Sequence, residues 1–278
     1  MLSGTGAEIL PYWSFTKTAL AICALKLVEA GRLELDAPLK DAPYSLRQLL
    51  EHSAGLPDYG TLPAYHAAVA ADEEPWSRAH LREATLAQGM RFAPGTGWCY
   101  SNLGYMQVGE LIEEASGQPL ATHLREALTA PLGLSSVRLA TRREDFAPIP
   151  WPGARSYHPG WVYHGCLTGT APDAARLLDA LFRGTLLAPP TLARMLERQP
   201  LGGAIEGRPW TDCGYALGLM SARVGGSGRA IGHSGGGPFC VNAVYHFPDL
   251  GSGVTVASFA PGPDVGIPEA AAVAHAVD

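Results

Sequence analysis

A serine and a lysine three residues apart, Ser14 and Lys17, open an apolar run that predicts a helix ending near Gly31. Residues with this spacing are neighbours on a helix, with Cβ atoms about 5–6 Å apart, so the hydroxyl and the amine can hydrogen-bond. The N-terminal end of a helix also favours a negative charge or a bound anion. The pattern therefore predicts a nucleophile beside a possible base.

Lys17 is one of only three lysines among the 20 basic residues of this 278-residue chain. An arginine could not act as the base, because its guanidinium stays protonated at any working pH. A lone Ser-x-x-Lys pattern on a helix is nevertheless usually a surface accident, so its interpretation depends on other motifs.

The second motif is Tyr100-Ser101-Asn102, which follows a Pro-Gly turn at residues 94–95 and precedes an apolar periodic segment. These features are typical of a loop that enters a helix. A tyrosine in such a loop can point into a cleft, and its phenol can become a base if a lysine charge stabilises the phenolate. The alternative is a half-buried tyrosine followed by an asparagine that caps a helix.

The third motif, His233-Ser234-Gly235-Gly236-Gly237, precedes a segment rich in β-branched and aromatic residues that predicts a strand. Glycines in a strand allow a ligand or another backbone to approach closely. A flexible turn is the alternative.

Ser234 is also a rival nucleophile, because residues 232–236 fit the G-x-S-x-G elbow of α/β-hydrolases. That elbow requires a strand, a sharp turn and then a helix, followed by an acid and a histidine. The downstream segment is strand-like here, although His246 and His275 do follow. The elbow therefore remains the less favoured alternative.

In this order the three motifs resemble the active-site motifs of the serine β-lactamase and penicillin-binding protein superfamily. The particular resemblance is to the class C β-lactamase-like serine hydrolases, which include D,D-peptidases, D-aminopeptidases and esterases. Two flanking segments agree: residues 49–59 resemble the family's "LLxHxSGLPDY" and residues 130–134 its "xPLGM". The resemblance covers roughly residues 12–260.

The resemblance implies an α+β fold of the β-lactamase/transpeptidase type, in which helices flank an antiparallel sheet and a mostly helical lobe adjoins it. We expect residues 1–40 and 170–278 to form the α/β lobe and residues 41–169 the helical lobe, in one intimately packed catalytic unit. Helices are expected at 77–86, 103–115, 120–130, 170–184, 190–198 and from 268, and strands at 215–224, 229–235, 238–247 and 253–259.

Family members carry a helix and two strands before the nucleophile, whereas thirteen residues precede Ser14 here. Either the sheet lacks a strand or two and exposes an edge that could pair between subunits, or the start of the chain was trimmed.

The resemblance implies two-step acyl transfer, in which Ser14 attacks a carbonyl and its proton passes to the Lys17/Tyr100 pair. The oxyanion would lie between the backbone N–H groups of Ser14 and Gly236. The implied substrate-binding residues are Asn102, His233, Ser234 and Gly235.

His233 stands where most β-lactamases have a lysine, and a histidine there is found in peptidase and esterase relatives. We therefore expect hydrolysis of a D-amino-acid peptide or a carboxylic ester, with weak or no β-lactamase activity. The alternatives are a non-catalytic penicillin-recognition sensor or scaffold and, less favoured, a true β-lactamase. Aromatic residues that could line an acyl pocket are Trp98, Tyr157, Trp161 and Phe239.

The resemblance implies a small ester, amide or short peptide as the partner, and composition argues against other classes. A net charge of −6 without a basic run argues against nucleic acid, and no window of about 18 apolar residues predicts a membrane span. The nine histidines show no paired-ligand spacing, so we expect no metal and no cofactor. Five cysteines cannot form a complete disulfide framework, and no signal peptide is recognisable. A cytoplasmic location is the simpler expectation, with a periplasmic or secreted one if the N-terminus was trimmed.

Overall fold

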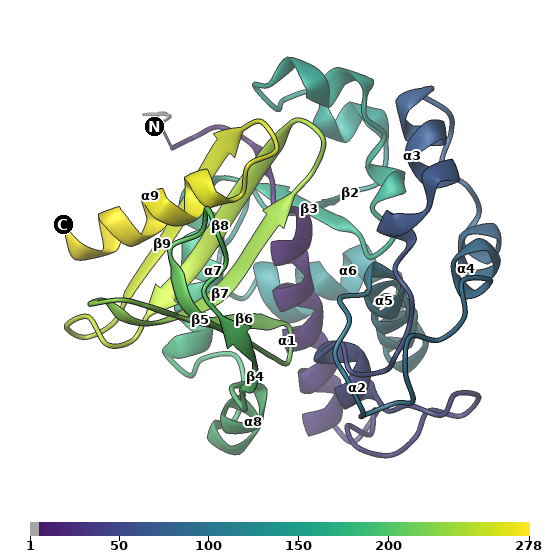
Figure 1. Cartoon of the computed structure of the whole chain (residues 1–278), viewed down its shortest axis with the longest axis horizontal. Coiled ribbons are helices and arrows are strands. Elements are labelled where there is room, and N and C mark those ends of the chain that lie inside the picture. The colour runs from purple at the N-terminus through teal and green to yellow at the C-terminus, as the bar shows by residue number, and fades with distance from the viewer. Residues whose placement is uncertain (1–5) are drawn as a thin grey trace.

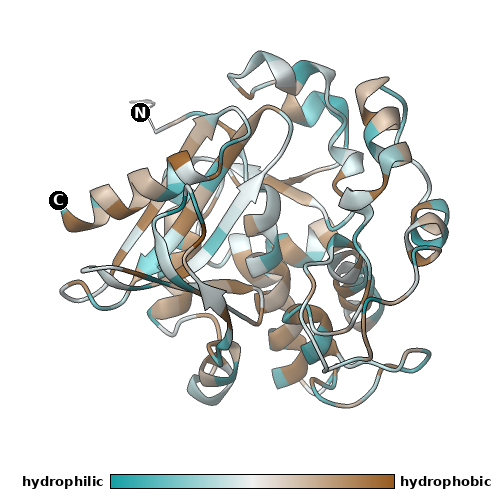
Figure 2. Cartoon of the chain, viewed as in Figure 1, coloured by the Kyte–Doolittle hydropathy of each residue, from teal (hydrophilic) through white to brown (hydrophobic). Residues whose placement is uncertain are grey.

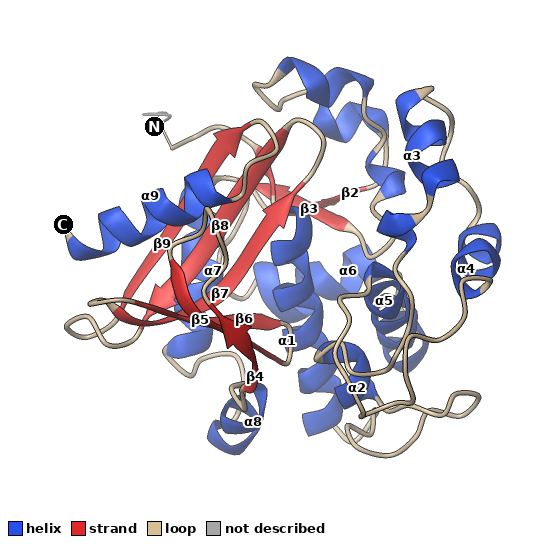
Figure 3. Ribbon diagram, viewed as in Figure 1, coloured by secondary structure: helices blue, strands red, loops and turns tan. Residues whose placement is uncertain are grey.

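The computed structural model describes residues 6–278, and its centre is a six-stranded antiparallel sheet with helices on both faces (Figures 1 and 3). The strands, in spatial order, are β4 (Gln199–Gly203), β5 (Trp210–Ala216), β6 (Leu219–Val224), β7 (Gly228–Gly236), β8 (Cys240–Phe247) and β9 (Val254–Pro261). A smaller antiparallel sheet has the order β1 (Leu10–Pro11), β3 (Cys166–Gly169) and β2 (Arg138–Ala140).

The described helices are α1 (Thr16–Glu29), α2 (Leu46–Leu50), α3 (Pro63–Ala70), α4 (Arg78–Leu86), α5 (Asn102–Ser116), α6 (Leu120–Leu124), α7 (Ala171–Phe182), α8 (Pro189–Met195) and α9 (Gly266–Val277). Several begin and end at residues that supply the missing backbone partners. Ser45 and Gln48 form a capping box at α2, and Ser101 accepts a hydrogen bond from the N–H of Gly104 at the start of α5. Gly117 ends α5 with a positive φ of 70°.

The two faces of the large sheet are covered by different helices. Figure 1 shows α9 across the near face and α7 behind the sheet, with α1 to the right of β7. Along β8 the side chains alternate accordingly: Cys240 and Val244 belong to the main core, whereas Ala243 and Tyr245 belong to a second cluster that includes Ala272 of α9. Apolar residues predominate along α1 and α9 in Figure 2, whereas the outer helix α4 is hydrophilic on one side.

The α+β class and most predicted elements are confirmed, with differences among the strands. The expected strand 215–224 is two strands, because the chain turns at Leu217–Gly218, where Gly218 has a φ of 72°. A Cβ at Gly218 would lie 2.4 Å from Ala21 of α1, so this hairpin tip needs a glycine to pack on the helix. Strands β1, β2, β3 and β4 were not expected, and helix α8 ends at Met195 and not at 198.

Another difference lies in the segment expected to be a single helix over 120–130. It is α6 followed by a π-helical turn, Arg125–Thr129. The wider turn shifts the hydrogen-bonding pattern by one residue, which no apolar periodicity reveals.

Strand β7 touches the N-terminal turn at a point where only glycine fits. A Cβ on Gly235 would lie 2.8 Å from the backbone nitrogen of Ser14 and 2.9 Å from the carbonyl oxygen of Tyr12. Gly236 is different, because its Cβ would meet only Val241 at 3.4 Å and Val265 at 3.5 Å. The third motif thus brings its strand within contact of the first motif.

We predict that Gly235→Ala lowers the free energy of unfolding by about 1–3 kcal/mol, the usual cost of overpacking a close contact. The matched variant Gly236→Ala should change it by less than about 1 kcal/mol, because its added methyl makes ordinary contacts. Urea unfolding followed by circular dichroism measures both. Equal stabilities of the two variants would contradict the contact at Gly235.

Candidate active site

Ser14 lies in the 3-10 turn Trp13–Phe15, between strand β1 and helix α1. The turn is held by β3, since the N–H of Tyr12 donates to the carbonyl of Leu167 at 2.7 Å and the N–H of Leu167 donates to Oγ1 of Thr16 at 2.9 Å. The hydroxyl therefore lies in the turn before α1, whereas the sequence predicted it at the start of the helix. Its place is set by contacts on both sides, from β3 and from β7.

The residue before Ser14 has an unusual backbone conformation. Trp13 has a φ of 44°, a region that costs a bulky residue strain energy. Its indole is 2% exposed and makes edge contacts with Phe146, Tyr157 and Phe239 at centroid distances of 5.3–5.9 Å. The indole N–H donates to Sγ of Cys240 at 3.2 Å. This packing holds the strained turn, and with it the hydroxyl of Ser14, in one orientation.

The three residues expected to be catalytic meet at one point. Nζ of Lys17 lies 3.1 Å from Oγ of Ser14, and the phenol of Tyr100 donates to the same Oγ at 2.8 Å. The amine also lies 4.9 Å from the centre of the Tyr100 ring. A hydroxyl held between an amine and a phenol is the arrangement expected of an activated nucleophile.

Burial decides the protonation of this cluster. Lys17 is fully buried, and the loss of solvation lowers its pKa well below the usual lysine value, although the Asp58 charge opposes this. Burial likewise raises the pKa of Tyr100, and the hydrogen bond to Ser14 only partly offsets it. Burial therefore disfavours both the ammonium of Lys17 and the phenolate of Tyr100 that a lysine charge was expected to stabilise.

Asn102 joins Lys17 to a buried carboxylate. Its Oδ1 accepts a hydrogen bond from Lys17 at 2.7 Å, and its Nδ2 donates to Asp58 at 3.2 Å. The backbone N–H of Asn102 also donates to Asp58 at 2.9 Å. Burial raises the pKa of Asp58, while the N–H of Asn102 and the charge of Lys17 lower it. Because Asp58 only accepts hydrogen bonds when ionised, it orients the Asn102 amide with its oxygen towards Lys17.

His233 lies behind Tyr100 and does not border the cavity. The ring is fully buried, with Nε2 3.0 Å from the Tyr215 phenol and Nδ1 2.5 Å from the carbonyl of Ser234. His52 lies 3.2 Å from the same phenol, and its Nδ1 accepts the N–H of Ser101 at 3.1 Å. His52 must then donate from Nε2 to Tyr215, which donates to His233. This chain supports the motif that carries Tyr100.

Ser234 differs from the expectation as well. In the register of β7 with β8, His233 is opposite Val244 and Ser234 is opposite Ala243, so Ser234 faces the helix α9 side. Its hydroxyl hydrogen-bonds to the Tyr245 phenol at 2.8 Å and to the buried carboxylate of Glu269, which Arg208 also binds. Strand β7 continues into β8 and not into a helix, so the rival elbow is wrong too.

A cavity of about 410 Å³ opens in front of Ser14. It is lined by Trp13, Ser14, Tyr59, Gly60, Tyr65, His66, Val69, Asn102, Tyr157, Trp161, Val162, His164, Gly236, Gly237, Pro238 and Pro263. Gly236 therefore borders the same space as Ser14, as a partner in an oxyanion site requires, whereas Gly235 acts through its contact with the Ser14 backbone. Of the four expected aromatic residues, Tyr157 and Trp161 line this cavity.

Sequence reasoning missed three residues of this cluster: Asp58, His52 and His164. The first two stand in the segment 49–59 already matched to the family, so their place in that segment could have identified them. His164 lies outside every motif, yet its Nε2 is 3.1 Å from Nζ of Lys17. The described part of the chain contains no group of three His, Cys, Asp or Glu side chains placed to hold a metal ion.

We predict that the free energy of unfolding falls as the pH drops below about 6.5, because the buried histidines bind a proton in the unfolded chain but not in the folded one. Burial lowers the pKa of His233 to about 3, so between pH 6.5 and 3 the unfolded state binds a proton that the folded state does not. Each such histidine adds up to about 1.4 kcal/mol per pH unit to the loss. Urea unfolding at several pH values measures the slope.

In the same measurement, His233→Gln should reduce the slope, whereas His275→Gln, at an exposed position of α9, should leave it unchanged. An unchanged slope in His233→Gln would show that this histidine is not buried in the neutral form.

Comparison with known proteins agrees with this geometry. A family model described as Beta-lactamase matches residues 5–278. Esterase EstB of Burkholderia gladioli is 28% identical in a match that covers 75% of this chain and 65% of the esterase. The chain thus spans slightly less than two thirds of that relative.

Two solved structures share the fold. The D-amino acid amidase of Ochrobactrum anthropi SV3, complexed with L-phenylalanine, matches with a TM-score of 0.80 at 23% identity, over 99% of this chain and 85% of the amidase. The octameric penicillin-binding protein homologue from Pyrococcus abyssi matches with a TM-score of 0.75 at 21% identity, over 99% and 66%. At such identities the likeness shows the fold alone. The family match, over nearly the whole chain, shows that this protein belongs to the Beta-lactamase family.

Proposed function

We propose that the chain is a serine hydrolase that uses Ser14 as its nucleophile and forms an acyl-enzyme to hydrolyse an ester or an amide. The observation that carries the proposal is the position of the Ser14 hydroxyl, 3.1 Å from the Lys17 amine and 2.8 Å from the Tyr100 phenol, at the edge of a cavity. An alcohol needs such a base to attack a carbonyl at neutral pH.

In the proposed reaction, Oγ of Ser14 forms a bond to the substrate carbonyl carbon while its proton passes to the neutral amine of Lys17. The oxyanion binds the backbone N–H groups of Ser14 and Gly236, each worth roughly 3 kcal/mol. The protonated Lys17 returns the proton to the leaving group through the Tyr100 phenol, which hydrogen-bonds to Oγ. Water then attacks the acyl-enzyme by the same route in reverse.

The cavity supports an ester or amide with a neutral, apolar group. Its lining includes Tyr59, Tyr65, Tyr157 and Trp161 and contains no lysine or arginine. A β-lactam carries a carboxylate, which such a wall leaves without a cationic partner. The names of the relatives, an esterase and a D-amino acid amidase, agree with a carboxylic ester or a D-amino-acid amide or peptide as substrate.

We predict that Ser14→Ala abolishes labelling by a fluorophosphonate probe and lowers turnover of p-nitrophenyl esters at least about 1000-fold, since the covalent step is lost. Ser234→Ala is the matched control, because its hydroxyl lies on the other face of the sheet, and it should remain labelled. Turnover retained in Ser14→Ala would disprove the proposal.

Mass spectrometry of the wild type with an ester, a D-amino-acid amide and a penicillin distinguishes the alternative functions. An ester or amide adduct that forms and clears supports the hydrolase. A persistent penicillin adduct would instead favour the sensor, rapid penicillin turnover a true β-lactamase, and no adduct a scaffold.

Three further proposals concern the molecule as a whole. Residues 1–40 and 170–278 are proposed to form an α/β lobe and residues 41–169 a helical lobe of one catalytic unit. Five free cysteines, an odd number, support a reducing compartment such as the cytoplasm. The net charge of −6 supports the absence of a nucleic-acid partner. Within residues 6–278, none of the helices combines the length and apolar character needed to cross a membrane.

We also propose that the chain assembles with copies of itself through strand β9. This strand pairs only with β8 among the described strands, carries no charged residue along Val254–Pro261, and borders an apolar groove of about 730 Å³ between α7 and α9. Natural edge strands are usually protected by charges or proline, and β9 has only Pro261 at its end, so residues 254–260 favour pairing.

We predict that the wild type is a dimer or larger by light scattering coupled to size exclusion, and that Ser258→Lys, which places a charge on this edge, shifts it towards monomer. Circular dichroism should show Ser258→Lys to be folded. A wild type that is monomeric at high concentration would contradict assembly through β9.

A further inference from the structure

His164 is a buried residue beside the amine of Lys17 to which no motif assigns a role. It is 4% exposed and lines the cavity in front of Ser14. Its Nε2 lies 3.1 Å and its Nδ1 3.4 Å from Nζ of Lys17. The ring therefore contacts the base itself and borders the same cavity as Ser14.

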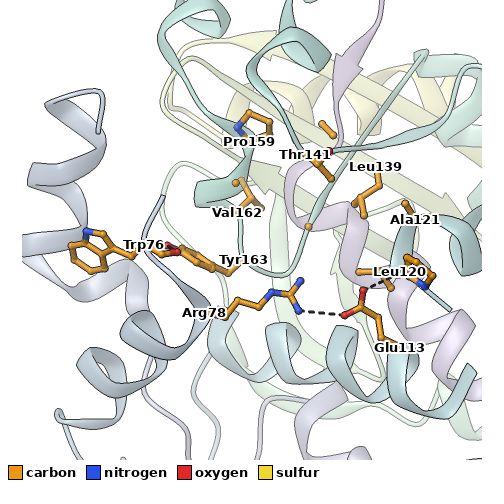
Figure 4. Close-up of a pocket in the computed structure, with 14 residues that line it drawn as sticks. Trp76, Arg78, Glu113, Leu120, Ala121, Leu139, Thr141, Pro159, Val162 and Tyr163 are labelled. Carbon is orange, nitrogen blue, oxygen red and sulfur yellow. Dashed lines mark hydrogen bonds and ion pairs between the residues drawn. The ribbon is translucent and has the colours of Figure 1, made fainter. Parts of the chain in front are cut away.

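The segment that carries His164 is anchored on both sides. The Trp161 indole donates to the carbonyl of Glu73 at 3.1 Å, and the Tyr163 phenol donates to the carbonyl of Trp76 at 2.9 Å. The N–H of Tyr163 donates to the Tyr59 phenol at 3.2 Å. Figure 4 shows Tyr163 and Trp76 at a second cavity of about 340 Å³. Within residues 159–165, some side chains line this second cavity, others line the cavity of Ser14, and Val162 lines both. The imidazole is thus held in place by a wall between two cavities.

The hydrogen bonds of Lys17 reveal what the imidazole can do. A neutral amine has two N–H donors and one lone pair, and Nζ has three close partners: Asn102, His164 and Ser14. The Asn102 oxygen must accept one N–H, since Asp58 fixes the orientation of that amide. If a ring nitrogen of His164 accepts the other N–H, only the lone pair remains, and it faces the hydroxyl of Ser14.

The same arrangement suits the amine after it has taken the proton. An ammonium group has three donors, which Asn102, His164 and the oxygen of Ser14 can all accept. His164 must be neutral for this, and its burial and the neighbouring Lys17 both lower its pKa. The other titratable groups that face the pair are Asp58, Cys166, His52 and His233.

We infer that His164 is a positioning residue that accepts a hydrogen bond from Lys17 and so directs the lone pair of the base at Ser14. This inference rests on the proposed function of Ser14 and Lys17. His164 does not take the proton from Ser14; it acts through the orientation of the amine.

The test compares His164→Leu, which fills similar space without an acceptor, with His164→Gln, which offers a neutral amide oxygen. His164→Leu should lower kcat for a p-nitrophenyl ester about 10–100-fold with little change in KM, because the base is misoriented. It should also move the acid limb of the pH–rate profile about half a unit or more to lower pH, since the ammonium form loses an acceptor. His164→Gln should restore most of both.

Each outcome has a distinct meaning. A loss of kcat in His164→Leu without movement of the acid limb, and without rescue by His164→Gln, would mean a structural role and overturn the inference. Equal inactivity of the two variants would also overturn it, because a neutral amide acceptor would then not replace the imidazole. Unchanged kcat in His164→Leu overturns it directly.

The same set separates this inference from the proposed function. If the wild type is never labelled at Ser14 by a fluorophosphonate, both are overturned. If Ser14 is labelled and the His164 variants behave as wild type, only the role of His164 is overturned. The exposed His275→Ala serves as the matched histidine control and should keep the wild-type rate and profile.

Discussion

The burial of a single amine organises this molecule. Lys17 is fully enclosed within the core, where a charged ammonium would be costly without partners. Its partners come from four separate parts of the chain: Ser14 from the N-terminal turn, Tyr100 from the loop before α5, Asn102 from α5 itself and His164 from the segment before β3. Moving any of these elements would remove a partner of the amine. The site and the fold are therefore stabilised by the same contacts.

The two faces of the sheet make different contacts. On the α1 face, Gly235 lets β7 touch the backbone of Ser14, and His233 supports the residues behind Tyr100. On the α9 face, Ser234 and Tyr245 surround the buried Glu269, whose charge Arg208 balances. A one-residue shift in register would exchange these roles, so the pairing of β7 with β8 must be tightly specified. The buried network around Glu269 supplies polar contacts that oppose such a shift.

Much of the fold and the centre of the site could be predicted from the sequence, because their causes are local. The Ser14–Lys17 spacing, the capping box at Ser45 and the turn glycine at Gly117 act within a few residues. The family motifs placed Tyr100 and Asn102 beside them. Two expectations met properties that depend on the folded chain: burial opposes a phenolate at Tyr100, and Ser234 occupies the opposite face of its strand. Neither property can be read from spacing along the chain.

The amino-acid sequence alone determined the family motifs, the helices and strands with strong periodicity, and the residue types able to serve as nucleophile and base. Tertiary structure decided the rest, because burial and long-range contact depend on how distant segments meet. It placed His164 against Lys17 across 147 positions, enclosed His233, and turned Ser234 away from the cavity. Proton affinity depends on solvent exposure and neighbouring charge. Only the folded chain could therefore lower the pKa of Lys17 and raise that of Tyr100.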